Sequence, residues 1–257
     1  MMKANFFQSL LSAMSKITTV SIATIIGFIL LATSSCTEEE VKPDTEFGSM
    51  TDIDGNTYVT IRIGNQWWMA ENLRVQKYRN GDPVDEIVID SLWSQGAPGF
   101  SRHPQGSALT GLLYNWGVVG DNRGIAPSGW HVATDDDWKA LEKHLGMSET
   151  AAQRTGWRGD KEGDALKATG TENWVRFDPV WADNSSGFSA AAGSCRIIDG
   201  RYGDPGVRYT GFWWSSTPDP TDSMKACYRY LDYKSSRVFR QFELRQYGFS
   251  IRCVKDK

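Results

Sequence analysis

Cysteine and histidine are scarce in this chain of 257 residues, which contains four of the former and three of the latter. The cysteines lack the close spacing of a zinc site, and the histidines lack the spacing of a metal-binding pair. The sequence also has no Gly-x-Ser-x-Gly elbow, His-Glu-x-x-His helix or phosphate-binding loop. We therefore expect no metal, no cofactor and no catalysis, although the many carboxylates leave a glycosidase pair open as an alternative.

Basic stripes are lacking as well. The formal net charge is −3, and no basic stretch with interleaved aromatic residues appears, which argues against a nucleic-acid partner. Acidic residues are absent from the first 35 positions, whose only charges are Lys3 and Lys16. A mostly apolar run over 17–32 follows, and this is the layout of an export signal. Because a spanning helix needs roughly 20 apolar residues, permanent insertion is the weaker interpretation.

Three small residues lead directly into Cys36. This arrangement resembles the lipobox of bacterial lipoproteins, in which a peptidase cleaves just before a diacylated cysteine, although Thr33 stands where an aliphatic residue is usual. We expect residues 1–35 to be a lipoprotein signal peptide and Cys36 to anchor the chain to the membrane through lipid. Ordinary secretory cleavage, which would leave Cys36 as a free thiol, is the alternative. The true start is Met1 or Met14, and Met14 gives the more usual n-region.

The segment 36–48 is interpreted as a flexible acidic tether. It carries three consecutive glutamates at 38–40, and such a charged run cannot pack a core. An acidic run at this position resembles the surface-export signal of Bacteroidetes-type lipoproteins. We therefore expect an outer-membrane lipoprotein exposed on the cell surface, whereas a plain solvated tether would explain the same residues without export.

One folded domain is expected over 49–257. An Asp-Gly pair at 54–55 separates two strand candidates, and the alternating run 58–63 turns back into 66–69, which predicts a small antiparallel meander. The stretch 79–110 is rich in Gly, Pro, Ser and Asp, so it is predicted to be a long surface excursion.

The clearest helix is predicted over 134–145, where Thr134 is a good N-cap and three aspartates follow it. A second short helix is expected after Ser148, and a third turn or two over 164–168. Strands are then predicted at 193–198, 212–216, 225–233, 237–242 and 249–254. This segregation indicates an α+β domain that is rich in loops, with short, mostly antiparallel strands and one or two helices.

Eight motifs occur in the order found in one bacterial domain family. They are Asp-Ile-Asp-Gly-Asn at 52–56, Gln-Trp-Trp-Met-Ala-Glu-Asn-Leu at 66–73, Tyr-Asn-Trp at 114–116, Ala-Pro-Ser-Gly-Trp-His-Val-Ala-Thr at 126–134, Leu-Lys-Ala-Thr-Gly at 166–170, Gly-Phe-Ser-Ala at 187–190, Trp-Trp-Ser-Ser-Thr at 213–217 and Tyr-Gly-Phe-Ser-Ile-Arg-Cys-Val at 247–254. The chain from 51 onward thus resembles the Fibrobacter succinogenes major paralogous domain, which occurs in lipoproteins of fibre-degrading and Bacteroidetes-type bacteria.

The resemblance implies a fold related to C-type-lectin-like and formylglycine-generating-enzyme-like domains, and it supplies no catalytic residues. Lectin-type calcium sites use Glu-Pro-Asn or Gln-Pro-Asp with Trp-Asn-Asp, and neither pattern is present. Cys195 and Cys227 both depart from the family pattern, either as a lineage-specific disulfide or as mere substitutions. By count alone, every pairing among these two and Cys253 stays open, as does a fully reduced state.

Aromatic residues are the remaining lead to a ligand, because Trp and Tyr stack on sugar faces and anchor interfaces. Those in regular elements are expected in the core: Trp67, Trp68, Trp130, Trp138, Trp213 and Trp214. Those in loop-like segments are candidates for an exposed binding face: Trp93, Phe100, Trp181, Tyr202 and Tyr209. The first hypothesis is a noncatalytic binding or adhesion module for a glycan or a surface protein. The alternatives are a structural envelope or assembly component without a small ligand, and an enzyme with an unrecognised site.

Overall fold

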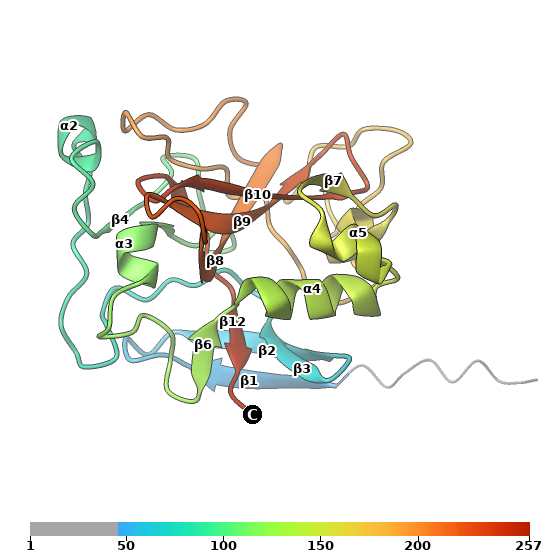
Figure 1. The fold of residues 1–257 in the computed structure, drawn as a ribbon, viewed down its shortest axis with the longest axis horizontal. Coiled ribbons are helices and arrows are strands. Elements are labelled where there is room, and N and C mark those ends of the chain that lie inside the picture. The colour runs from blue at the N-terminus through green and yellow to red at the C-terminus, as the bar shows by residue number, and fades with distance from the viewer. Residues whose placement is uncertain (1–45) are drawn as a thin grey trace, which may run out of the picture. The chain divides into compact units, whose positions relative to one another are not determined.

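The computed structural model describes residues 46–257, so the predicted signal peptide and Cys36 lie outside the described residues. This part of the chain is a loop-rich α+β domain built on three antiparallel sheets (Figure 1). The first sheet has the order β1-β2-β3-β12-β6, the second β7-β10-β9-β8 and the third β11-β5-β4. The strands are β1 (Phe47–Thr51), β2 (Thr57–Ile63), β3 (Gln66–Met69), β4 (Phe100–Ser101), β5 (Leu113–Asn115), β6 (Trp130–Val132), β7 (Gly156–Arg158), β8 (Thr210–Pro218), β9 (Lys225–Asp232), β10 (Val238–Leu244), β11 (Gly248–Phe249) and β12 (Cys253–Lys255).

The N-terminal meander predicted from alternation is confirmed as β1, β2 and β3. Its first turn is held by Asp52, whose carboxylate accepts hydrogen bonds from the backbone N–H groups of Asp54 and Asn56 at 2.9 Å. Gly55 lies in this turn with φ +82°, a left-handed conformation that glycine adopts without a steric penalty. The first strand begins at Phe47, two residues before the predicted start of the domain.

Five helices occur in the described region, and four of them have only four or five residues. They are α2 (Asp90–Trp93), α3 (Trp116–Val119), α4 (Asp135–His144), α5 (Glu149–Gln153) and α6 (Glu162–Leu166). The predicted capping of α4 is confirmed, because Thr134 and Asp137 form a reciprocal capping box. Ser148 caps α5 as expected. Within 46–257, no helix is both long and apolar enough to cross a bilayer.

Three of the C-terminal strands lie where alternation predicts them, as β8, β9 and β10. The segment 193–198 is not a strand and forms isolated bridges, among them Ser194 with Gly211. The predicted strand 249–254 is divided, because Phe249 pairs with β5 in one sheet while Cys253 pairs with β6 in another. The last residues therefore cross from one sheet to the next, and β12 joins the meander to β6 (Figure 1).

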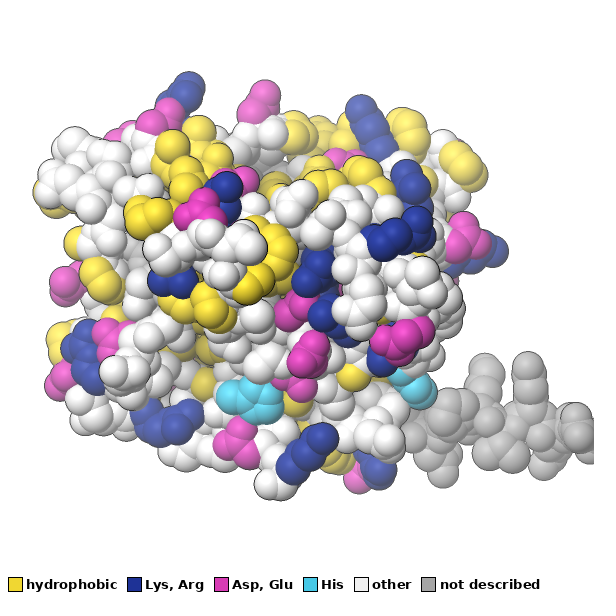
Figure 2. Space-filling view, in the orientation of Figure 1, with side chains coloured by type: hydrophobic (Ala, Val, Ile, Leu, Met, Phe, Trp, Pro, Cys, Tyr) yellow, Lys and Arg dark blue, Asp and Glu magenta, His cyan; other side chains and the backbone are white. Residues whose placement is uncertain are grey.

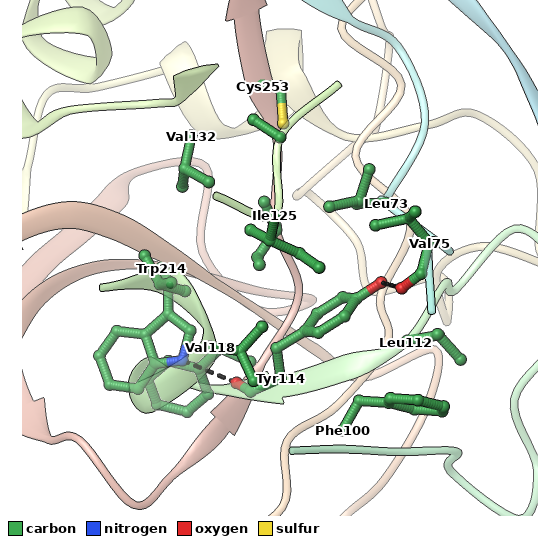
Figure 3. Packing of buried hydrophobic residues seen from close by; sticks show 14 of the residues in the cluster. Leu73, Val75, Phe100, Leu112, Tyr114, Val118, Ile125, Val132, Trp214 and Cys253 are labelled. Carbon is green, nitrogen blue, oxygen red and sulfur yellow. Dashed lines mark hydrogen bonds between the residues drawn. The ribbon is translucent and has the colours of Figure 1, made fainter. Parts of the chain in front are cut away.

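Two hydrophobic clusters fill the space between the sheets. In the first, Trp214 on β8 donates from its indole N–H to the carbonyl of Tyr114 at 2.9 Å. The Tyr114 hydroxyl donates to the carbonyl of Val75 at 2.7 Å (Figure 3). Both donor groups are buried, and burial without a hydrogen-bond partner would cost about 1–3 kcal/mol each. The two hydrogen bonds avoid this cost and also fix the orientation of the rings.

Helix α4 packs against one face of the sheet β7-β10-β9-β8 through buried charges. Glu142 accepts two hydrogen bonds from Arg158 at 2.8 Å and one from Arg229 at 2.6 Å. Asp135 accepts from Arg229 at 2.8 Å and from Arg240 at 2.7 and 2.8 Å. The five side chains are almost fully buried, and every charge has a partner of the opposite sign. This face of the sheet is therefore buried under α4 and is not available to a ligand.

Candidate functional site

Two of the predicted binding aromatics are corrected by the structure. Trp93 is 0% exposed and Phe100 is 1% exposed, so neither belongs to a binding face. The long excursion over 79–110 folds back over the core and carries both rings inward. The Arg196 guanidinium lies 4.5 Å from the Trp93 ring centre, and Phe100 packs against Tyr114 with ring centres 6.1 Å apart.

Trp181, in contrast, is 52% exposed and lines a cleft of about 220 Å³, which we call the Trp181 cleft. The cleft is lined by the segments 167–176 and 180–182 and by Tyr233. Phe177, 40% exposed, packs edge-on against Tyr233 with ring centres 5.6 Å apart. Tyr209 meets the same Tyr233 ring edge-on at 5.1 Å. Of the predicted residues, Trp181 lines the cleft and Tyr209 packs behind it, against the Tyr233 ring that also lines the cleft.

Cations already lie against the rings of the Trp181 cleft. The Arg176 guanidinium lies 4.5 Å from the centre of the exposed Trp181 ring. The Lys234 ammonium lies 5.0 Å from the Tyr233 ring. Lys167, at the floor, is buried against Asp164 at 3.2 Å and the carbonyl of Ser235 at 2.7 Å, and burial lowers the pKa of its ammonium. A ligand here would meet apolar ring faces at a rim with positive charge.

Tyr202, the remaining predicted residue, lines a different hollow of about 440 Å³, the Tyr202 pocket. This pocket lies on the face of the sheet β7-β10-β9-β8 that is turned away from α4. Figure 1 shows α4 on one side of the sheet and the orange segment before β8 on the other. In Figure 2, hydrophobic side chains gather over the upper part of the molecule, where this sheet lies.

A chain of touching aromatic rings covers that outer face. The contacts are Trp157–Phe239 at 5.3 Å, Phe239–Tyr230 at 5.9 Å, Tyr230–Phe212 at 4.6 Å, Phe212–Phe249 at 5.1 Å, Phe249–Tyr228 at 5.1 Å and Phe249–Tyr247 at 5.7 Å. None of these residues was predicted to bind a ligand. The signal available in the sequence was the alternation of aromatics along β8 and β9, which places Phe212, Tyr228 and Tyr230 on one face of the sheet.

The tentative Cys195–Cys227 disulfide is wrong for this structure, in which both thiols and that of Cys253 are free and buried. Cys195 lines the Tyr202 pocket on the outer face of the sheet. Cys227 lies on the opposite face, where its thiol donates to Asp135 at 3.1 Å. The sheet itself separates the two sulfurs. Burial raises the pKa of the Cys195 thiol to about 12 and that of Cys227 to about 11.

Metal-ligating clusters are not found in the described part of the chain, where no group of three or more His, Cys, Asp or Glu side chains converges. The aspartates that follow Thr134 illustrate why. Asp135 binds two guanidinium groups, and Asp137 bonds to the helix cap and to His131 at 3.0 Å. Their oxygens are thus occupied by protein donors.

The motifs on which the family resemblance rests are used to tie the core together. Asn72 accepts hydrogen bonds from the indole of Trp213 at 2.9 Å and the guanidinium of Arg252 at 2.8 Å. Arg252 is buried without a carboxylate partner and donates to the carbonyls of Met69 and Phe188 at 2.8 and 2.7 Å. Four motifs distant in the sequence are joined at this one point. The side chains of Asn72, Trp213 and Arg252 face inward and offer nothing to a ligand.

Comparison with known proteins identifies one family. The model of the Fibrobacter succinogenes major domain matches residues 61–255, most of the chain. No curated protein and no solved structure matches the chain. The match begins within β2 and ends with β12, so it covers nearly all of the domain described above. The chain belongs to the Fibrobacter succinogenes major domain family.

Proposed function

We propose that the protein is a noncatalytic binding module, anchored by lipid at Cys36 and displayed on the outer-membrane surface, that holds a glycan in the Trp181 cleft. The observation that carries this proposal is the large exposed face of Trp181 beside a cleft that Tyr233 also lines. The indole ring is flat, rigid and amphipathic, and sugars present C–H faces that pack on such rings.

The remaining lining suits a sugar as well. Thr169 and Thr171 supply hydroxyl groups at the cleft, and the Lys167 floor is fixed by its own buried partners. Arg176 and Lys234 add positive charge at the rim, so neutral and acidic sugars are both compatible with the site. We also propose that the domain has a C-type-lectin-like or formylglycine-generating-enzyme-like fold, which is supported by its many loops and short antiparallel strands.

The proposed anchoring is supported by the sequence ahead of the domain. An uncharged apolar run precedes Cys36, and an acidic segment follows it. Two or more acyl chains would hold the domain firmly at the membrane, where one would be marginal. The domain begins at β1 only a short distance along the chain from Cys36, so the cleft would work close to the cell surface.

A glycan array and a panel of insoluble polysaccharides, screened with the full chain, would test the proposal. We expect saturable binding to at least one glycan that weakens at least tenfold, about 1.4 kcal/mol, in Trp181→Ala. Leu92→Ala is the matched control, because Leu92 is similarly exposed but lies on α2, away from the cleft. Failure of the folded protein to bind any glycan would refute the carbohydrate proposal, and equal losses in the two variants would refute the cleft.

The second candidate, a structural or assembly component, is favoured by one observation. Val88, Ile89 and Leu92 are all exposed on and just before the short helix α2, and they form an aliphatic patch without a pocket. Such a patch suits another protein better than a sugar. If Leu92→Ala abolished recovery of a specific envelope protein while Trp181→Ala left it unchanged, this candidate would replace the first.

A further inference from the structure

We infer that the Tyr202 pocket is a second binding site, independent of the Trp181 cleft, and that it takes an organic cation whose charged nitrogen carries methyl groups. Four rings form its apolar wall: Phe212, Tyr228, Tyr247 and Phe249. Phe212 and Phe249 stack at 5.1 Å with an angle of 17° between their planes, so each ring fixes the position of the other in the wall. Quaternary ammonium groups bind to such walls, because the electron-rich ring faces attract the dispersed positive charge.

The second step concerns the cations of the protein itself. Among the described residues, Lys or Arg side chains lie against several exposed or half-buried rings, for example Arg176 against Trp181 and Arg237 against Trp157. No such side chain covers any of the four wall rings of the Tyr202 pocket. Tyr202 itself has Arg196 at 5.4 Å, but that guanidinium is fully buried and is held by Asp90 at 2.8 Å. Tyr228 and Phe249 are nearly buried, whereas Phe212 and Tyr247 are half-buried, so these two rings are the ones that a cation from outside would contact.

A carboxylate completes the site. Glu243 lines the pocket from β10 and is only half-buried, with one oxygen accepting the backbone N–H of Leu244 at 2.9 Å. No Lys, Arg or His of residues 46–257 forms a salt bridge with it. The only cation lining the pocket, Arg201, is exposed and already paired with Asp199 at 2.7 Å. Asp204 lines the same pocket, so the charge that a ligand would meet is negative.

The pocket is thus the electrostatic opposite of the Trp181 cleft. In the cleft, Lys and Arg side chains of the protein lie beside the aromatic rings, whereas in the pocket no such side chain lies against the wall rings and Glu243 has no salt bridge. A volume of about 440 Å³ accommodates a trimethylammonium group together with the chain that carries it. The nitrogen is expected against the half-buried Phe212 and Tyr247 rings, near the Glu243 carboxylate, where ring attraction and charge attraction add.

Choline and its uncharged isostere 3,3-dimethylbutan-1-ol, titrated into the full chain and observed by saturation-transfer NMR of their methyl protons, provide the test. We expect choline to bind at least tenfold more tightly than the isostere. Glu243→Gln should remove most of that difference, whereas Glu46→Gln, an exposed glutamate on the meander side, should keep it. Phosphocholine distinguishes a lipid headgroup, which would bind as well as choline or better, from a free cation, which would bind better than phosphocholine.

Equal binding of choline and the isostere, or full binding by Glu243→Gln, would overturn the inference. Should Glu243→Gln fail to fold, Phe212→Leu provides a second variant that removes a ring face and keeps an apolar side chain. Choline binding that survives unchanged in Phe212→Leu would likewise overturn it. Trp181→Ala should bind choline normally, so failure of the glycan proposal and failure of this one are separate results.

Discussion

Glu142 is the buried carboxylate that links α4 to two strands of the sheet, and its replacement by glutamine is the sharpest test of how the domain is held together. The side chain is fully buried and accepts both terminal nitrogens of Arg158 at 2.8 Å and Nε of Arg229 at 2.6 Å. Glutamine keeps the shape but removes the charge and turns one acceptor into a donor. Arg158, which has no other carboxylate partner, would then be a buried charge without compensation.

Breaking a buried ion pair in this way costs about 3–5 kcal/mol. In a domain of this size each kcal/mol lowers the melting temperature by about 2–4 °C, so Glu142→Gln should lower it by about 6–20 °C. Reversible denaturant unfolding followed by circular dichroism would measure the loss. Glu149→Gln is the matched control. The 2.7 Å pair of Glu149 with Lys143 is exposed, so its loss should not change the free energy of unfolding measurably.

A double-mutant cycle shows whether the loss comes from the unpaired charge. Glu142→Met leaves Arg158 without a carboxylate, and Arg158→Met leaves Glu142 with Arg229 alone. The combined variant removes both charges of the pair and leaves apolar side chains of similar volume. The combined variant should therefore be more stable than the sum of the single losses by about 1–3 kcal/mol. Strictly additive losses, or a Glu142→Gln variant as stable as Glu149→Gln, would refute the role assigned to this network.

Two further predictions concern titration and thiols. Hydrogen bonds that the His131 ring donates to the carboxylates of Asp137 and Asp256 outweigh partial burial and raise the pKa of His131. Its contribution to stability is therefore complete below pH 6.5 and is lost as pH rises through the raised value. His131→Asn should therefore be destabilised relative to the parent near pH 6 and much less so near pH 9, and parallel denaturant midpoints across that range would contradict this. Alkylation without reductant should label Cys195 and Cys227 only after denaturation, because burial raises both pKa values, and peptide mapping that found them disulfide-linked would contradict the structure.

The elements that sequence reasoning found are those with local signals. The cap at Thr134, the Asp-Gly turn at 54–55 and the period-two alternation of β2 each depend on neighbours within a few residues, so a single segment contains the information. Trp93 and Phe100 were misplaced because composition predicts a loop but not what the loop covers. Their burial depends on partners more than ten residues away, among them Arg196 for the first ring.

The aromatic rings on the outer face of the sheet could not be predicted either, because they come from segments distant in the sequence. These rings come from β7, β8, β9, β10 and β11, and no one segment contains enough of them to indicate a surface. That Glu243 has no salt bridge among the described residues cannot be predicted from the sequence, because it depends on where the Lys and Arg side chains of other segments lie. A sequence can mark a strand as aromatic on alternate positions, but only the strand order shows that the rings meet.

Family motifs and ligand choice overlap only in part in this domain. Motif residues line both hollows, such as Thr169 in the Trp181 cleft and Tyr247 in the Tyr202 pocket, but other motif side chains serve the core alone. Trp213 and Arg252 both donate hydrogen bonds to the buried side-chain oxygen of Asn72, so a substitution at any of the three would destabilise the fold rather than alter recognition. Trp181 and Glu243 lie outside the motifs, and each lines a hollow without bracing the core. Relatives that keep the motifs should therefore share this architecture, while exchanges at these two positions alter what each hollow can bind. An exchange of Glu243 for lysine in a relative would place a cation over the bare rings, and that protein should have lost the cation site and kept the fold.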